Sequence, residues 1–193
     1  MLMNENNIAI GKKYRHFKGN EYLVLYIAKH SETLEDMVVY QALYGERGVW
    51  VRPLSMFIEK KEVDGKMISR FEEIKTELEI LEEICNLIRK HIGSIPFKSR
   101  GIVITKELIE ATLKILNSEP TKAMPQNSRN ATRANTPEGL DRSIKDVLDF
   151  DLRTANIISD VLQYVGVVQV ANVINPTTGR KVKGTKLLPE WQW

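Results

Sequence analysis

The sequence predicts an α+β protein of two domains, in which a small β-barrel-like domain is followed by a helical domain that ends in a β-hairpin. Residues 14–71 contain short β-rich runs separated by turn residues. The apolar residues then repeat every three or four positions, which is the period of a helix. Near the C-terminus, two short helical patterns precede two alternating strands. A chain of 193 residues is long enough to form both cores.

Composition and charge narrow the classes of protein. With 42% hydrophobic and 27% charged residues, most of the chain is expected to fold. The net charge of +3 is too small to indicate nucleic-acid binding by itself, so the distribution of charge must decide. No apolar run approaches the roughly 20 residues that cross a bilayer, and Cys85 is the single cysteine. We expect a cytoplasmic protein without membrane segments, disulfides or a multi-cysteine metal site.

Three or four short strands are predicted in the first domain, residues 1–73. They span residues 22–28, 37–44, 49–53 and 57–63, and turn residues separate them. Pro53 should end the third strand, because proline cannot donate a ladder hydrogen bond. Strands this short are expected to form a small SH3-like barrel or a curled sheet.

A helix is expected to connect the domains within residues 74–104. From residue 71 to residue 92 the apolar positions recur at spacings of four and three, and Cys85 lies on this stripe as a small buried hydrophobe. Ile80, Ile84 and Leu87 widen the stripe, which favours packing against the rest of the chain. A homodimer formed through this helix remains an alternative.

The second domain, residues 105–193, is expected to begin with a helix that Thr105 caps and that extends to about Asn117. Residues 118–137 then contain three prolines and many small polar residues, a composition that predicts a flexible loop. Arg129 and Arg133 in this loop are interpreted either as solvated side chains or as partners of a phosphate backbone.

Residues 143–168 have the pattern of a helix-turn-helix. A helix over 143–148 is followed by a tight turn and by a second helix over 152–164, for which Asp151 is a suitable N-cap. The residues expected to face inward are Ile144, Val147, Leu148, Ala155, Ile158, Leu162 and Val165.

A basic hairpin is predicted to complete the second domain. The chain alternates as a strand after Gly166, turns through residues 175–179 and returns through residues 182–188. The return arm carries four cationic residues, Arg180, Lys181, Lys183 and Lys186. Their charge suits a phosphate backbone.

Residues 105–193 thus resemble the winged helix-turn-helix domains of bacterial and phage DNA-binding regulators. The resemblance implies that the second helix of the pair exposes Arg153, Thr154, Asn156, Ile157, Ser159 and Asp160. Asn156 suits an adenine edge and Arg153 a guanine or a phosphate, whereas Ile157 and Asp160 are poor partners for a polyanion. The nucleic-acid-binding residues are therefore predicted to be Arg153, Thr154 and Asn156 together with the four hairpin cations. Use of the same architecture for protein interaction or dimerisation remains an alternative.

A second resemblance concerns residues 11–57. The pieces that carry it are Tyr14 to Gly19 (YRHFKG), His30 to Thr33 (HSET), VYQ at 39–41, LYG at 43–45, WVRP at 50–53 and MF at 56–57. They closely resemble a small bacterial and phage family known only as a domain of unknown function. The resemblance supports a domain boundary near Ile74 and implies no activity.

The same segment is rich in groups that recognise ligands. The predicted ligand-binding residues are Arg15, His16, His30, Glu32, Tyr40, Gln41, Tyr44, Trp50 and Arg52. If they converge, they suit a small anionic or nucleotide-like ligand that stacks on Trp50 or Tyr44. The alternative is that the aromatic residues fill the core and that Arg52 forms a structural ion pair with Glu32.

Catalytic motifs are not found in the sequence. It contains no phosphate-binding glycine loop, no supported carboxylate pair and no nucleophile motif, and His16, His30 and Glu32 have no evident third metal ligand. We expect no catalytic residue, metal or cofactor.

Two functional hypotheses follow. The first is a DNA-associated regulatory or accessory protein of a bacterium or phage, whose β-domain senses a ligand or partner. The second is a module that binds or sequesters a small molecule or protein and uses its winged helix for assembly.

Overall fold

The structure, a computed structural model, describes residues 8–127, 136–149 and 153–193. The backbone divides into two units, Met1–Lys75 and Thr76–Trp193. Each unit has its own hydrophobic core. The helix that was expected to connect the domains belongs to the second unit.

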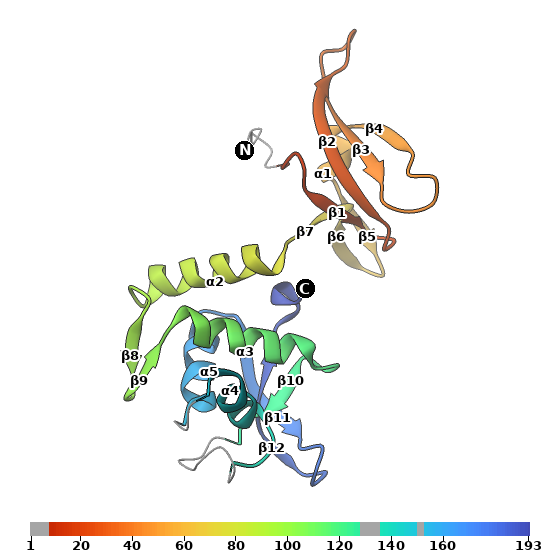
Figure 1. Cartoon of the computed structure of the whole chain (residues 1–193). Coiled ribbons are helices and arrows are strands. Elements are labelled where there is room, and N and C mark those ends of the chain that lie inside the picture. Colours follow the sequence, from red (N-terminus) through yellow and green to blue (C-terminus); the bar gives the residue numbers. More distant parts are fainter. Residues whose placement is uncertain (1–7, 128–135, 150–152) are drawn as a thin grey trace. The chain divides into compact units, whose positions relative to one another are not determined.

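The first unit is built on an open antiparallel sheet with the strand order β4-β3-β2-β1-β7 (Figure 1). Its strands are β1 (Lys13–His16), β2 (Glu21–Lys29), β3 (Asp36–Ala42), β4 (Val49–Pro53) and β7 (Phe71–Ile74). In the described part of the chain, β4 and β7 remain edges and do not pair, so the predicted barrel is wrong. Between them the chain forms α1 (Leu54–Ile58) and a separate hairpin of β5 (Lys60–Val63) and β6 (Lys66–Ser69). This hairpin takes the residues that would have been needed to close the sheet.

Helix α1 replaces the beginning of a predicted strand. β4 ends at Pro53 as expected, and Leu54 and Phe57 then place their side chains on one face of a helical turn. Phe57 is fully buried, and its ring stacks on that of Phe71 with centroids 4.1 Å apart. The pattern over residues 57–63 therefore combined a buried helical residue with strand β5.

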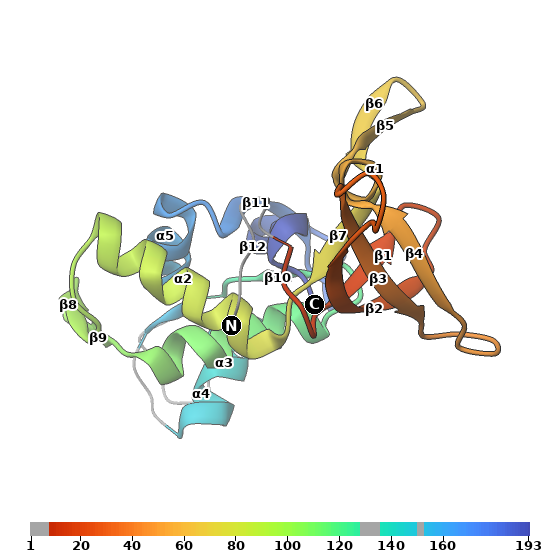
Figure 2. The ribbon, with the colours of Figure 1, turned by 90° about the horizontal axis from the view of Figure 1, so that it is seen from above.

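Helix α2 (Glu77–His91) begins six residues later than predicted. Its start is fixed by a capping box, in which the Thr76 hydroxyl accepts from the Glu79 amide at 3.3 Å and the Glu79 carboxylate accepts from the Thr76 amide at 2.9 Å. Residues 71–74 pair with β1 instead of continuing the helix. The part of the stripe that is buried in the core of the second unit consists of Ile80, Leu81, Ile84, Cys85 and Ile88, and there α2 packs against α3 (Figure 2). Leu78 is 69% exposed and Leu87 is half-buried, so the buried stripe is narrower than predicted.

After α2 the chain forms the hairpin of β8 (Phe97–Ser99) and β9 (Ile102–Ile104), and then α3 (Lys106–Ser118). The predicted cap of α3 is confirmed, because the Thr105 hydroxyl accepts from the Leu108 amide at 3.2 Å. The predicted loop over 118–137 is wrong at β10 (Ala123–Pro125), which pairs with β12 (Lys181–Leu187). Arg129 and Arg133 lie outside the described residues.

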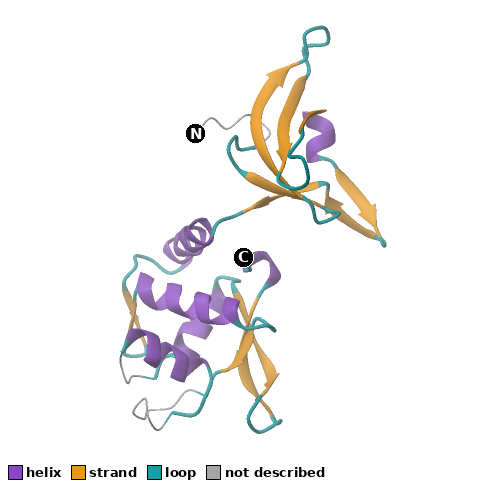
Figure 3. Ribbon diagram, turned by 45° about the vertical axis from the view of Figure 1, so that its right-hand side comes forward, coloured by secondary structure: helices purple, strands orange, loops and turns teal. Residues whose placement is uncertain are grey.

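The rest of the second unit consists of α4 (Leu140–Leu148), α5 (Ala155–Tyr164), β11 (Val168–Ile174), β12 and a short 3-10 helix (Pro189–Trp191). Its antiparallel sheet has the order β10-β12-β11, and Figure 3 shows the helices gathered beside it. The predicted hairpin over 168–188 is confirmed. Asp151, the predicted N-cap of α5, lies outside the described residues.

The buried face of α4 differs from the prediction. Val147 is 60% exposed, whereas Leu140, Asp141, Ile144 and Lys145 are buried. These four residues follow the one-turn spacing of a helix, so the buried stripe is continuous even though two of its members are charged. Among the described helices, none has the length and apolarity that crossing a bilayer requires.

Candidate functional site

The β11–β12 hairpin has a tip that its own side chains hold in place. The Asn175 side-chain oxygen accepts from the amides of Thr177 and Thr178 at 2.9 and 3.0 Å, which forms an Asx turn. The backbone N–H of Asn175 donates to the backbone carbonyl of Arg180 at 2.9 Å, and this hydrogen bond closes the loop.

Four cationic side chains extend from this hairpin into solvent. Arg180, Lys181, Lys183 and Lys186 are all exposed, and within the described residues no carboxylate forms an ion pair with any of them. Because side chains alternate along a strand, Lys181 and Lys183 lie on one face of β12 and Lys186 on the other. Glu138 is an acid beside the tip, where its carboxylate accepts from the Thr177 hydroxyl at 3.5 Å. The hairpin therefore presents an excess of positive charge.

Helix α5 exposes less of its surface than the sequence suggested. Thr154, Ile157 and Ser159 were expected to be exposed, but the structure buries all three. The side chain of Thr154 is therefore not available to a nucleic acid. Arg153 is exposed and Asn156 is half-buried, and the Arg153 Nε donates to the Asn156 side-chain oxygen at 3.2 Å.

The β8–β9 hairpin explains why this face of α5 is covered. Arg100, in the hairpin turn, donates to the Asp160 carboxylate at 2.6 Å and to the Asn156 carbonyl at 3.5 Å. Ile157 belongs to the same core as Ile102 and Ile104 of β9. Sequence reasoning missed this contact, because no local pattern relates residues 97–104 to residues 156–160. As a consequence, Arg100 neutralises the negative charge of Asp160, the acidic residue of α5 that would repel a polyanion.

A buried ion pair positions α5 against α4. The Asp141 carboxylate lies 3.2 Å from the Lys145 ammonium, and neither side chain is exposed. The same carboxylate accepts from the amides of Thr154 and Ala155 at 2.9 Å each, at the start of α5. Lys145 also donates to the Thr136 hydroxyl at 2.9 Å. Asp141 thus supplies, from a neighbouring helix, the capping oxygen that α5 does not obtain from Thr154.

A second buried polar group joins the sheet to α5. The side-chain amide nitrogen of Gln126 donates to the Thr185 hydroxyl at 3.0 Å. The hydroxyls of Thr185 and Ser159 lie 2.6 Å apart. Ser159 also donates to the Ala155 carbonyl at 2.5 Å. All three polar side chains are buried, so β10, β12 and α5 are linked by satisfied hydrogen bonds.

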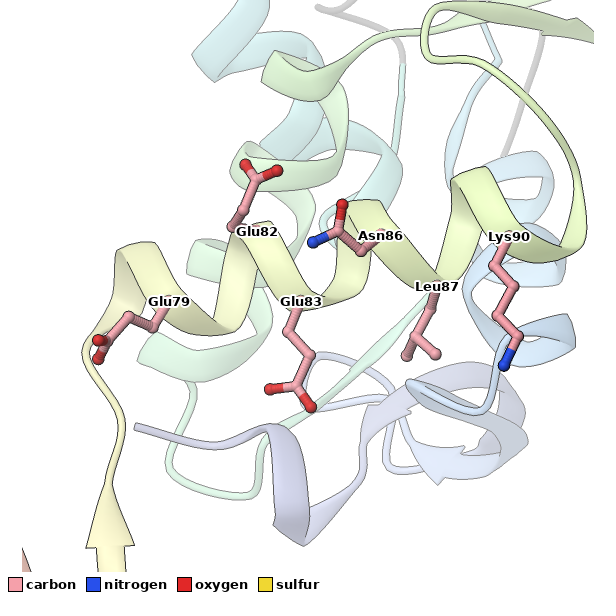
Figure 4. Close-up of a pocket in the computed structure, with 6 residues that line it drawn as sticks. All are labelled: Glu79, Glu82, Glu83, Asn86, Leu87 and Lys90. Carbon is pink, nitrogen blue, oxygen red and sulfur yellow. The ribbon is translucent and has the colours of Figure 1, made fainter. Parts of the chain in front are cut away.

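An open groove along α2 coincides with none of the predicted site residues (Figure 4). Its lining residues are Glu79, Glu82, Glu83, Asn86, Leu87 and Lys90. Three carboxylates against one ammonium make it unsuitable for an anion. In the parts of the chain that the structure describes, no group of three or more His, Cys, Asp or Glu residues could hold a metal ion.

Cys85 is buried on the inner face of α2, and burial, the main cause, raises the pKa of its thiol above the ordinary value. We expect a thiol reagent such as 5,5′-dithiobis(2-nitrobenzoic acid) to label the folded protein slowly and the protein in urea at once, because the thiolate is the reactive form. Absorbance of the released thiolate measures both rates. Equal rates would contradict the burial of Cys85.

In the first unit, three of the predicted ligand residues converge on the ring of Phe71. The His16 ring lies 4.9 Å from it, and the Arg52 guanidinium carbon lies 5.9 Å from its centroid. The Arg52 Nε donates to the Tyr40 hydroxyl at 3.3 Å, and Tyr40 lies 5.6 Å from Phe71. We call the set His16, Lys18, Arg52, Arg70 and Phe71 the His16–Arg52 cluster.

Cations surround the imidazole of this cluster. The pKa of His16 lies below its ordinary value, first because the ring is partly desolvated and then because Arg70, Arg52 and Lys18 are close to it. The His16 Nδ1 accepts from the Lys18 amide at 3.3 Å, which leaves Nε2 as the protonated nitrogen of the neutral ring.

Two exposed aromatic residues extend from the same face. The Tyr44 and Tyr22 hydroxyls lie 2.6 Å apart, and Tyr22 packs edge-on against Phe71 at 5.5 Å. Burial and the hydrogen bond to Tyr44 raise the pKa of Tyr22 to about 12. Trp50, paired with Tyr40 across the β3–β4 ladder, is 59% exposed.

The other predicted ligand residues lie elsewhere. Arg15 and Gln41 alternate with His16 and Tyr40, so they lie on the opposite face of the sheet, where Arg15 pairs with Glu21 at 3.0 Å. His30 and Glu32 belong to the β2–β3 turn, in which the His30 Nδ1 accepts from the Glu32 and Thr33 amides at 3.3 and 3.2 Å. No ion pair joins Glu32 to Arg52 in the described part of the chain, so that expectation was wrong.

Comparison with known proteins bears on this unit alone. Residues 12–73 match the family described as "Protein of unknown function (DUF1653)". The chain belongs to this family through its first unit. A crystal structure of a DUF1653 protein from Bordetella bronchiseptica is 33% identical, and the match covers 37% of this chain and 92% of that chain with a TM-score of 0.34. No curated protein matches the chain.

The DUF1653 match contains every member of the His16–Arg52 cluster. Sequence reasoning missed Lys18, Arg70 and Phe71 as members of one site. The motif YRHFKG contained Lys18, but Arg70 and Phe71 fell in the segment that was assigned to a loop and a helix. Residues 71–74 (Phe-Glu-Glu-Ile) do not alternate between apolar and polar, so the sequence carried no signal that distinguished this short strand from a helix. The DUF1653 domain therefore brings together residues from β1, β4, β7 and the adjoining turns.

Proposed function

We propose that the second unit is a winged helix-turn-helix domain that binds duplex DNA mainly through phosphate contacts of the β11–β12 hairpin, its wing. The order of the elements α3, β10, α4, α5, β11 and β12 supports the fold assignment. So does the sheet order β10-β12-β11, which places the two wing strands side by side at the end of the domain.

The single observation that carries the proposal is the unpaired charge of the wing. Four exposed cations on one hairpin attract a polyanion, and binding would release the counterions condensed on the phosphates. Helix α5 would contribute fewer contacts to DNA than the sequence suggested. Of its predicted nucleic-acid-binding residues, Arg153 is exposed and Asn156 half-buried, whereas Thr154 is buried. Two such side chains give little sequence readout, so we propose binding with weak sequence preference.

This function is that of a regulatory or accessory DNA-associated protein of a bacterium or its phage, which implies a cytoplasmic location. The DUF1653 domain would supply the part that senses a ligand or partner.

Salt-titrated binding to a short DNA duplex tests the proposal. With about four phosphate contacts, the affinity should fall roughly 150-fold between 50 and 200 mM salt. Fluorescence anisotropy of a labelled duplex measures this slope.

A charge-reversed wing is the matched variant. Lys181→Glu with Lys183→Glu should weaken binding at least about tenfold and lower the salt slope by about two. The control is Lys60→Glu with Lys66→Glu, which reverses two exposed lysines on the β5–β6 hairpin and gives the same net charge. No binding at about 25 mM salt, or equal losses in the two variants, would contradict the proposal.

A further inference from the structure

The His16–Arg52 cluster has an excess of positive charge that the first unit does not neutralise. Arg70 contacts the Glu59 carboxylate, which also pairs with Lys61 at 3.3 Å. Arg52 and Lys18 form no ion pair within the described residues. Within the described residues, Glu59 is the one carboxylate that forms an ion pair with a cation of the cluster, and it is shared between Arg70 and Lys61. Such a surface attracts an anion.

Contacts among the described residues of the first unit orient the Arg52 side chain but do not use its two terminal nitrogens. Its Nε is used by the Tyr40 hydroxyl, and its position over the Phe71 ring restricts the guanidinium further. Within the described residues, its two terminal nitrogens have no hydrogen-bond partner. A guanidinium held in this way suits bidentate binding of a phosphate.

Exposed aromatic rings lie next to this charge. Trp50 precedes Arg52 by two residues on β4, so the two side chains leave the same face about 7 Å apart. Tyr44 is 45% exposed, and its hydroxyl is held by Tyr22 of the same aromatic cluster. An indole or phenol ring that is held and partly solvated is a platform on which a planar base can stack.

We infer that the His16–Arg52 cluster binds a nucleotide, with the phosphate on Arg52 and Lys18 and the base stacked on Trp50 or Tyr44. The Nε2–H of His16 supplies a further donor to the phosphate. This inference is independent of DNA binding by the wing.

Calorimetric titration of the full chain with AMP, adenosine and inorganic phosphate tests the inference. The protein carries Lys181→Glu and Lys183→Glu, so that the wing does not contribute. AMP should bind at least tenfold more tightly than adenosine or phosphate alone, because it engages both halves of the site.

Two variants of the cluster and one matched control identify the residues involved. Arg52→Gln should weaken AMP binding about 10- to 100-fold, as expected for the loss of charge-assisted hydrogen bonds. Lys18→Gln, at an exposed position, should weaken it less without affecting folding. Arg15→Gln removes an arginine of the same unit from the opposite face, and it should leave binding unchanged. Thermal melts confirm that each variant is folded.

A short oligodeoxyadenylate, titrated in parallel, identifies the source of the nucleotide. If only the oligonucleotide binds, and binds less tightly to Arg52→Gln, the cluster binds a nucleotide that is part of a single-stranded nucleic acid. If AMP binds equally well, it takes a free nucleotide. The inference is overturned if neither ligand binds at millimolar concentration, if phosphate alone binds as well as AMP, or if Arg15→Gln weakens binding as much as Arg52→Gln.

Discussion

Replacing Asp141 by alanine is expected to lower the free energy of unfolding of the second unit by about 3–5 kcal/mol, because it leaves the Lys145 ammonium buried without its carboxylate. The substitution also removes the acceptor of the Thr154 and Ala155 amides at the start of α5. Loss of the ion pair and loss of the capping hydrogen bonds both weaken the contact between α4 and α5, so we expect these two helices to lose their packing in one step. Urea denaturation followed by circular dichroism measures the change.

The control for this prediction is Asp146→Ala on the same helix. Asp146 pairs with Arg142 at 3.0 Å, but both side chains are partly exposed, and such pairs contribute about 0–1 kcal/mol. A loss for Asp141→Ala no larger than that for Asp146→Ala would show that the buried pair does not stabilise the unit.

Replacing Phe57 by alanine should cost the first unit about 3–5 kcal/mol. Phe57 is fully buried, and its ring contacts those of Tyr14, Tyr40 and Phe71. Its removal leaves a cavity among the aromatic rings of the first unit's core. Hydrogen exchange measured by mass spectrometry should show faster exchange in peptides from residues 8–75 and unchanged exchange in peptides from residues 76–193.

The neighbouring substitution Met56→Ala serves as its control, because Met56 is 44% exposed and its loss should change stability by well under 1 kcal/mol. Together with Asp141→Ala, this experiment tests whether the two cores unfold separately. Increased exchange throughout the chain in either variant would contradict two independent units.

Features that depend on neighbouring residues were predictable from the sequence. Thr105 caps α3 because the hydroxyl and the helix it caps are adjacent, and the hairpin over residues 168–188 follows from alternation around a turn. The end of β4 at Pro53 is equally local. In each case one residue type and its immediate surroundings determine the structure.

Features that depend on distant residues were not predictable. β1 pairs with β7 across more than 50 residues, and among the described residues the two edge strands β4 and β7 do not pair with each other, so the sheet is open. The burial of Asp141 and Lys145 contradicts the usual exposure of charged residues, and it follows only from the approach of α5 and Thr136. Helix α5 resembled an exposed recognition helix because the hairpin that covers it contacts it across 56 to 60 residues of sequence.

In the candidate site of the first unit, too, some features depend on neighbouring residues and others on distant ones. Alternation alone separates Arg15 from His16 once β1 is recognised as a strand. The convergence of His16 and Arg52 on Phe71 requires the order of all five strands of the sheet, which the sequence does not reveal. Of the five members of the His16–Arg52 cluster, His16 and Arg52 were predicted from their chemistry alone, and the other three were missed.

The hydrogen bonds among Gln126, Thr185 and Ser159 determine which residues of the wing can face solvent. If β12 slipped by one position, Gly184 or Lys186 would take the place of Thr185, and Gln126 and Ser159 would lose their common partner. The position of Gly184 also admits no side chain, because a Cβ there would lie 2.2 Å from Val173, so neither Lys183 nor Thr185 could slip into it. The backbone of the hairpin can therefore adopt a single alignment, which fixes the spacing of the Cα atoms of its lysines. Binding at this hairpin would order side chains but would cost little backbone entropy.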